Sequence, residues 1–113
     1  MNKLNIVQNY INYRNSNNIS SILELCSNDI QFIDAYGVKY NGKTAFEEYL
    51  KIPTPTSEWY KPVIVGDIVI VKGRVYKMFM WWGVSVKFEF NNEHNFVMSE
   101  GYEYIKKITL ERT

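Results

Sequence analysis

The chain has 113 residues, of which 46% are hydrophobic and 16% aromatic, and its net charge is +1. This length suits one hydrophobic core, so we expect a single domain over residues 1–113. The basic residues are scattered along the chain, which argues against a nucleic-acid partner and against a membrane surface. No apolar run is long enough to span a bilayer or to direct secretion, and the single Cys26 suits a reducing compartment. We therefore expect a soluble, cytoplasmic protein.

Two helices are predicted at the start of the chain. Apolar residues recur with helical spacing over residues 3–15, with Tyr10 near the middle of the apolar stripe and Arg14 one turn later. Asn18 is a suitable N-cap for a second, short helix. Cys26 ends the apolar pattern of that helix, and we interpret it as a buried thiol that fills space in the core.

The next segment, residues 28–37, reads as a strand that has an acid on its apolar face and ends in a turn at residues 36–37. Ile30, Phe32 and Asp34 alternate along one side of it. A lone buried carboxylate is costly, so Asp34 must be hydrogen-bonded, paired or directed into a cavity. Two interpretations follow: Asp34 is a general base in an apolar pocket, or its side chain caps the turn at residues 36–37.

One more helix and then a sheet are predicted for the rest of the chain. A capping-box pattern at Thr44 begins the helix, and Pro53 and Pro55 end it. Strands are expected at about 57–65, 67–81, 84–91 and 96–106, with Gly73 as a kink and turns at Gly83 and residues 91–95. Helices followed by strands indicate an α+β fold. We expect a cone-shaped roll of three N-terminal helices packed on a curved, mostly antiparallel β-sheet, with Tyr10 and Asp34 facing its cavity.

The segment Met78-Phe79-Met80-Trp81-Trp82 places large apolar side chains on both faces of a predicted strand. One of these faces must then meet something other than the core of its own chain. We expect a homodimer that forms through the outer face of the sheet.

The order of these elements resembles the nuclear transport factor 2-like superfamily, which includes ketosteroid isomerases and polyketide cyclases, over nearly the whole chain. Residues 7–10, Val-Gln-Asn-Tyr, look like the helix-1 tyrosine motif of the isomerases, and residues 34–37, Asp-Ala-Tyr-Gly, look like their Asp-Pro-x-Gly motif. Tyr10 and Asp34 stand 24 positions apart, which is the spacing in that family. The resemblance implies that Asp34 is the general base and that Tyr10 donates a hydrogen bond to an oxyanion, without a cofactor.

Two positions depart from the isomerase pattern. Ala35 replaces the proline that follows the base. Val86 stands where a second, protonated acid belongs, just before Phe88-Glu89-Phe90, and a valine cannot donate a hydrogen bond.

The sequence supports two classes of function. One is a domain that binds a small apolar ligand in the cone. If this domain is an enzyme, we expect it to be a cofactor-free isomerase, cyclase or dehydratase. The other is a catalytically inert member that binds a ligand or a protein partner. Candidate ligand-binding residues are Arg14, Phe32, Trp59, Phe88, Glu100 and Tyr102.

Charged candidates keep alternative interpretations. Arg14 could pair with Asp34 or Glu100 inside the cone, or extend its charged end to the rim. Glu100 could be a second carboxylate in the cavity or the solvated end of a strand. The lone His94 lies in a predicted polar turn, so no metal site is expected.

Overall fold

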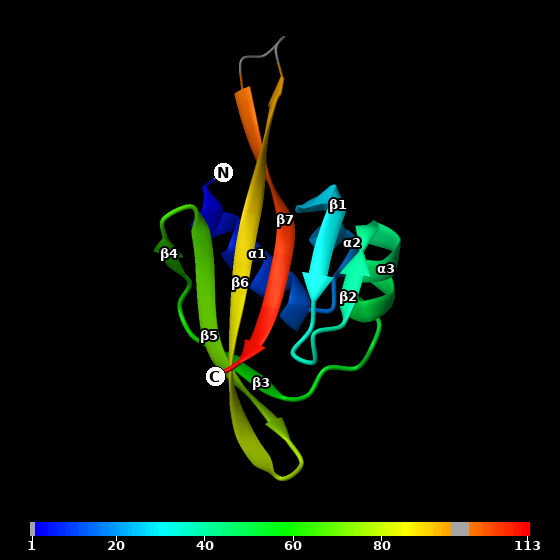
Figure 1. Ribbon diagram of the computed structural model, residues 1–113, viewed down its shortest axis with the longest axis vertical. Helices are drawn as coiled ribbons and strands as arrows, with labels where there is room; N and C mark the ends of the chain where they lie inside the picture. The colour runs from blue at the N-terminus through cyan, green and yellow to red at the C-terminus, as the bar shows by residue number, and fades with distance from the viewer. Residues whose placement is uncertain (1, 96–99) are drawn as a thin grey trace.

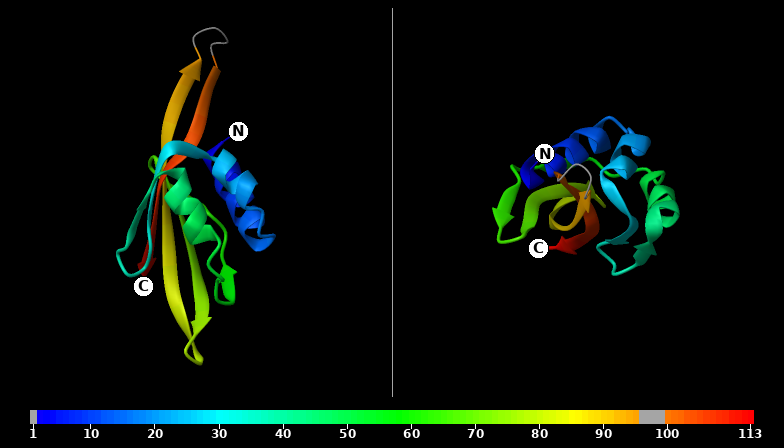
Figure 2. Two further views of the ribbon diagram at one scale, coloured as in Figure 1. Left: turned by 90° about the vertical axis from the view of Figure 1, so that its right-hand side faces the viewer. Right: turned by 90° about the horizontal axis from the view of Figure 1, so that it is seen from above.

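The computed structural model describes the backbone of residues 2–95 and 100–113 and the side chains of residues 2–91 and 103–113. The described residues form three helices and seven strands. The helices are α1 (Lys3–Asn15), α2 (Ile19–Glu24) and α3 (Gly42–Leu50). The strands are β1 (Cys26–Ile33), β2 (Lys39–Asn41), β3 (Ser57–Trp59), β4 (Val63–Val65), β5 (Ile68–Lys77), β6 (Met80–Asn95) and β7 (Glu100–Arg112). All three helices lie on one side of the sheet (Figures 1 and 2), so the predicted α+β roll is confirmed.

The sheet has the strand order β2-β1-β7-β6-β5-β3, and β4 also pairs with β5. Every pairing is antiparallel except that of β1 with β7, which is parallel. The sheet is therefore mostly antiparallel, as predicted. The last strand of the chain lies inside the sheet, between the first strand and β6.

Several strand ends differ from the prediction. The strand expected at 57–65 is two short strands, because Pro62 lies between them and a proline has no N–H to donate to β5. The strand expected at 67–81 ends at Lys77, because Met78 and Phe79 turn the chain with φ values of 52° and 65°. This turn replaces the one predicted at Gly83, which pairs with Arg74 inside the ladder.

The last two strands are longer than the sequence indicated. β6 continues to Asn95 through the turn predicted at residues 91–95, because those residues pair with residues 100–104 of β7. β7 continues past the predicted end at residue 106 to Arg112, since its later residues pair with both β1 and β6.

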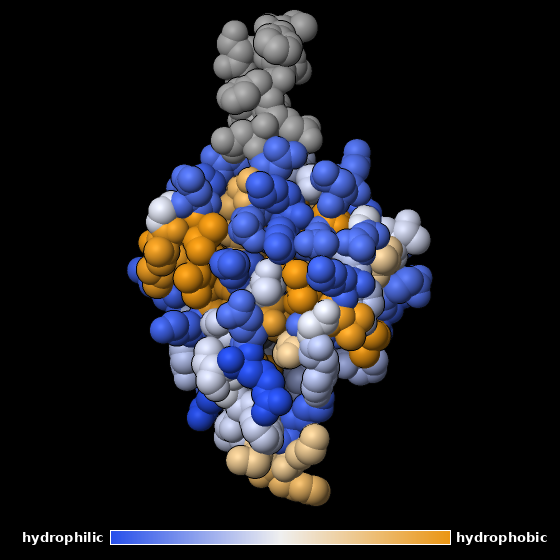
Figure 3. Space-filling model, in the orientation of Figure 1, coloured by the Kyte–Doolittle hydropathy of each residue, from blue (hydrophilic) through white to orange (hydrophobic). Residues whose placement is uncertain are grey.

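The apolar residues that motivated the homodimer do not form one strand with two apolar faces. Met78 and Phe79 are the exposed tip of the β5–β6 hairpin, which extends beyond the rest of the molecule (Figure 1). Much of the face of the sheet turned away from the helices is hydrophilic, and apolar residues gather over β4, at the hairpin tip and in smaller areas toward β1 and β2 (Figure 3). The homodimer stays a prediction, with less apolar outer surface to support it than residues 78–82 suggested.

The closely packed core lies between the helices and the inner face of the sheet. Its members with at most 3% exposed surface include Ile6, Val7, Ile22, Ile30, Phe46, Ile105 and Ile108. Cys26 is buried with them, as predicted, and burial raises the pKa of its thiol to about 12. Among the described residues, no helix combines the length and the apolar character needed to cross a membrane.

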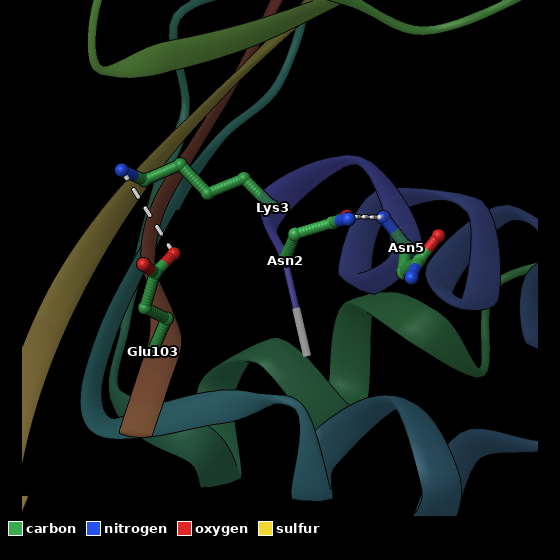
Figure 4. Close-up of polar contacts among 4 residues, drawn as sticks. All are labelled: Asn2, Lys3, Asn5 and Glu103. Carbon is green, nitrogen blue, oxygen red and sulfur yellow. Dashed lines mark hydrogen bonds and ion pairs between the residues drawn. The ribbon is translucent and has the colours of Figure 1, made fainter. Parts of the chain in front are cut away.

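The N-terminal end of α1 is fixed by two polar contacts, drawn in Figure 4. The Asn2 side chain accepts a hydrogen bond from the backbone N–H of Asn5 at 2.8 Å, which caps the helix. Lys3 Nζ lies 3.8 Å from a carboxylate oxygen of Glu103 in β7, which is an ion pair too long to be a hydrogen bond. With this end of the helix held against β7, Tyr10 is buried against the inner face of the sheet.

Candidate functional site

A cavity of about 500 Å³ lies between the C-terminal half of α1, the end of α3 and the inner face of the sheet. This volume is within the range of small-molecule sites in proteins. Six of the predicted site residues line it: Tyr10, Arg14, Phe32, Asp34, Trp59 and Phe88. The side chains of Glu100 and Tyr102 lie outside the described residues, as does that of His94. The structure therefore brings together every predicted site residue whose side chain it describes.

Aromatic rings form much of the cavity wall. Tyr49 of α3 lies with its ring centroid 4.3 Å from that of Phe32 and 5.1 Å from that of Tyr40. The ring of Tyr10 meets Phe88 edge to face at 5.2 Å. Sequence reasoning missed Tyr40 and Tyr49 as site residues. The apolar stripe of the third helix contained Tyr49, but such a stripe does not distinguish a core residue from a cavity residue.

Trp59 reaches the cavity because Gly73 lies opposite it in the β3–β5 ladder. A Cβ atom added to Gly73 would collide with the backbone oxygen of Glu58 and with the ring of Trp59. The sequence predicted a kink at this glycine. The structure gives it a packing role, which is to leave room for the indole ring that lines the cavity.

Tyr10 is 7% exposed, and burial raises the pKa of its phenol well above the ordinary value. The positive charge of Arg14 opposes this shift without cancelling it. The Tyr10 hydroxyl therefore keeps its proton at neutral pH and can donate a hydrogen bond. This property is the one that an oxyanion donor needs.

Arg14 is half-buried at the same end of the cavity. Its Nη1 donates to the backbone oxygen of Leu50 at 3.4 Å, and its guanidinium carbon lies 5.9 Å from the ring centroid of Tyr49. Among the described residues, no carboxylate lies within ion-pair distance of it. The pairing of Arg14 with Asp34, one of the alternatives drawn from the sequence, is absent.

Asp34 has the contacts of a turn cap. Its Oδ1 accepts hydrogen bonds from the backbone N–H groups of Tyr36 and Val38, each at 2.9 Å. Gly37, with a φ of 82°, completes the turn by donating to the backbone oxygen of Asp34. The other carboxylate oxygen of Asp34, Oδ2, accepts no hydrogen bond from the part of the chain that the structure describes, and Asp34 lines the cavity. One carboxylate can thus cap the turn and present an oxygen to a ligand.

Tyr49 lies under the influence of both charged groups. Burial raises the pKa of its phenol, the positive charge of Arg14 lowers it, and the negative charge of Asp34 raises it. The charges of Arg14 and Asp34 therefore both act on the Tyr49 phenol at the wall of the cavity. Val86 also lines this wall, so the position of the isomerase's second acid is inside the cavity but holds no donor.

The charges that line the cavity are mostly positive. Lys77 and Arg112 join Arg14, whereas Asp34 is the only acid among the described lining residues. Lys77 Nζ donates to the Tyr36 hydroxyl at 2.7 Å, and the Arg112 guanidinium lies 4.8 Å from the ring centroid of Trp82. No cluster of potential metal ligands occurs in the described residues.

No protein-family model and no curated protein matches the sequence. Solved structures do match the fold. A cystatin-fold protein from Novosphingobium aromaticivorans has a TM-score of 0.77 at 14% identity, covering 99% of both chains. A nuclear transport factor 2-like protein of unknown function from Cytophaga hutchinsonii has a TM-score of 0.70 at 10% identity, covering 96% of this chain and 87% of its own.

A third similar structure contains a bound pigment. The Orange Carotenoid Protein of Anabaena (Nostoc) sp. PCC 7120, binding canthaxanthin, has a TM-score of 0.70 at 16% identity. The match covers 97% of this chain and 36% of that longer chain. At these identities the likeness concerns the fold alone, and it agrees with the architecture that the sequence predicted.

Proposed function

We propose that this chain, which has the nuclear transport factor 2-like fold, binds a small and largely apolar organic molecule in the cavity beneath α1. The observation that carries the proposal is the cavity itself, because its volume of about 500 Å³ suits such a molecule. Its walls support the same conclusion. Aromatic rings offer a large apolar surface, while a few polar groups, Tyr10, Arg14 and Asp34, are available to orient a ligand.

A cavity-filling variant tests this function. Val75 lines the cavity from β5, whereas Ile70 lies on the opposite face of the same strand and does not line it. Calorimetry with a panel of neutral apolar compounds should detect binding to the unmodified protein. Val75→Phe should weaken that binding by about tenfold or more, and Ile70→Phe should leave it unchanged. Equal binding to both variants would contradict the proposal.

Catalysis is a second candidate function for the same cavity. It is favoured by Oδ2 of Asp34, which accepts no hydrogen bond from the described residues, and by the protonated hydroxyl of Tyr10, since both residues line one cavity. In such a reaction Asp34 would take a proton from the carbon next to a carbonyl group, and Tyr10 would stabilise the oxyanion that forms. No cofactor is required for this chemistry.

Deuterium exchange tests the catalytic candidate directly. A small apolar ketone in heavy water should gain deuterium at the carbon next to its carbonyl faster with the protein than without it. Asp34→Asn should abolish the added rate, because an amide is a far weaker base than a carboxylate. If the protein binds apolar ketones without accelerating exchange, it is a binding protein, as the inert alternative holds.

A further inference from the structure

We propose that the inner end of the cavity is an anion site, in which Arg14 and Tyr10 bind the carboxylate of an otherwise apolar acid. This inference rests on the proposed binding function and names the chemical class of the ligand. Both residues belong to α1, one helical turn apart, so their side chains project from the same face of one rigid element. Both line the cavity.

The hydrogen-bonding capacity of Arg14 is largely unused. A guanidinium has five N–H donors arranged to bind a carboxylate in a fork. One of them donates to the backbone oxygen of Leu50 at 3.4 Å. This distance is longer than the usual range of about 2.7–3.2 Å for such hydrogen bonds. The positive charge of Arg14 also acts on the neighbouring Tyr10 hydroxyl, whose pKa it lowers. The remaining donors of Arg14 have no acceptor among the described residues, and Arg14 lines the cavity.

The surroundings of Arg14 make an anionic partner favourable. A half-buried charge without a counter-ion is costly, and here the guanidinium lies against the ring of Tyr49. Asp34, the acid on the same wall, is outside ion-pair distance, and its Oδ1 is occupied by two backbone N–H groups. A ligand carboxylate would supply the negative charge that none of the described side chains brings to Arg14.

A structural role for Arg14 does not remove this capacity. Leu50 is the last residue of α3, and a cation beside a helix C-terminus is stabilising. That role uses only one of the five donors. The Tyr10 hydroxyl adds a neutral donor beside the cation, because the phenol keeps its proton.

Positive charge elsewhere on the cavity wall favours the entry of an anion. Lys77 and Arg112 line the cavity and are exposed, whereas Arg14 is half-buried, so these two cations lie nearer to solvent. Such a charge distribution raises the local concentration of anions. The aromatic walls between the mouth and Arg14 suit an apolar body, so the ligand is expected to enter with its carboxylate first.

The test compares two probes that differ only in the head group, decanoic acid and 1-decanol, by isothermal titration calorimetry above the pKa of the acid. Decanoate should bind about tenfold or more tightly than decanol, as charge-assisted hydrogen bonds allow. Arg14→Met should remove this preference, because it should weaken decanoate binding much more than decanol binding. Tyr10→Phe should reduce the preference by a smaller factor.

Arg112→Met is the matched control, because it removes a guanidinium of the same cavity that lies over the ring of Trp82, and it should retain most of the preference. If Arg14→Met does not fold, Arg14→Gln takes its place. Equal binding of both probes to the unmodified protein, or an undiminished preference in the Arg14 variants, would overturn the anion site and leave the apolar-ligand function standing. Absence of binding by either probe and by the neutral panel would overturn both.

Discussion

The space between the helices and the sheet has a closed end and an open end, and the two contain different kinds of side chain. The closed end is filled by aliphatic residues and Phe46, all nearly without exposed surface. The open end is lined by aromatic rings and by charged groups such as Arg14 and Asp34. The change occurs within single elements: on α3, Phe46 belongs to the closed end, and Tyr49, three residues later, lines the cavity.

This contrast teaches what an apolar stripe on a helix can and cannot indicate. Phe46 and Tyr49 lie on the same face of α3, yet Phe46 packs in the core and Tyr49 lines the cavity. Aliphatic side chains without polar atoms pack closely, whereas a phenol or a guanidinium needs a partner or water for its polar end. A gradient from aliphatic to polar-tipped residues along a buried face therefore indicates where a core ends and a site begins.

The largest expected effect lies in the closed end. Phe46→Ala should lower the free energy of unfolding by about 3–5 kcal/mol, because the ring is fully buried and stacks on Phe32 at 5.1 Å. Urea denaturation measures this loss. Phe79→Ala is the control, since Phe79 is 94% exposed and its truncation should change stability by less than about 0.5 kcal/mol. Similar losses in both variants would contradict the division into two ends.

A second prediction concerns the glycine that admits Trp59 to the cavity wall. Gly73→Ala should cost about 1–3 kcal/mol of stability, since the new methyl group would force Trp59 and the backbone of β3 to move. Tryptophan fluorescence should shift in the folded state. Gly83→Ala is a matched control in the neighbouring strand, because its methyl group would collide only with the hydroxyl of the Thr113 side chain, which can move away.

A third prediction separates the two interpretations of Asp34. Asp34→Ala should lower the free energy of unfolding at pH 7 by about 0.5–2 kcal/mol, because two backbone N–H groups lose their acceptor. Asp34→Asn retains an acceptor oxygen and should lose less. Thermal melts of both variants measure the effect. Unchanged or raised melting temperatures would show that Asp34 contributes nothing to the turn.

The smallest effect at neutral pH is expected for Tyr10→Phe, which removes one hydroxyl and should matter mainly at alkaline pH. Burial raises the pKa of Tyr10 in the folded state, whereas the unfolded chain loses this proton at about pH 10. Above that pH the folded state binds more protons than the unfolded state, so stability falls as pH rises. Tyr10→Phe should make this fall less steep. Urea denaturation at several pH values checks the slope, and an unchanged slope would mean that the Tyr10 phenol ionises freely.

Much of the fold was predictable because its signals are local. The helix expected at residues 3–15 has the same bounds as α1, because its apolar stripe lies within the segment and its cap, Asn2, directly precedes it. The hairpin turn at Met78 and Phe79 was missed for the converse reason. Turns with positive φ usually contain Gly or Asn, and here the pairing of β5 with β6 holds two large residues in that conformation.

The candidate site was predictable in its residues more than in its contacts. Tyr10 and Asp34 could be found from their motifs, and the structure places both on the cavity wall. The part played by Tyr49 could not be found in this way, because it depends on Phe32, Arg14 and Asp34 arriving from other elements. The absence of a described carboxylate within ion-pair distance of Arg14 is likewise a property of the folded chain.

The position of β7 has a consequence for how the molecule acquires its structure. The strand pairs in parallel with β1, and Cys26 and Ile105 are partners in that ladder although most of the sequence separates them. Contacts between distant parts of a chain slow folding, because a long loop must close before they form. During synthesis, β1 cannot pair with β7 until residues 100–112 have been made. We therefore expect a late, cooperative folding step, with the inner edge of β1 exposed to other chains until it occurs.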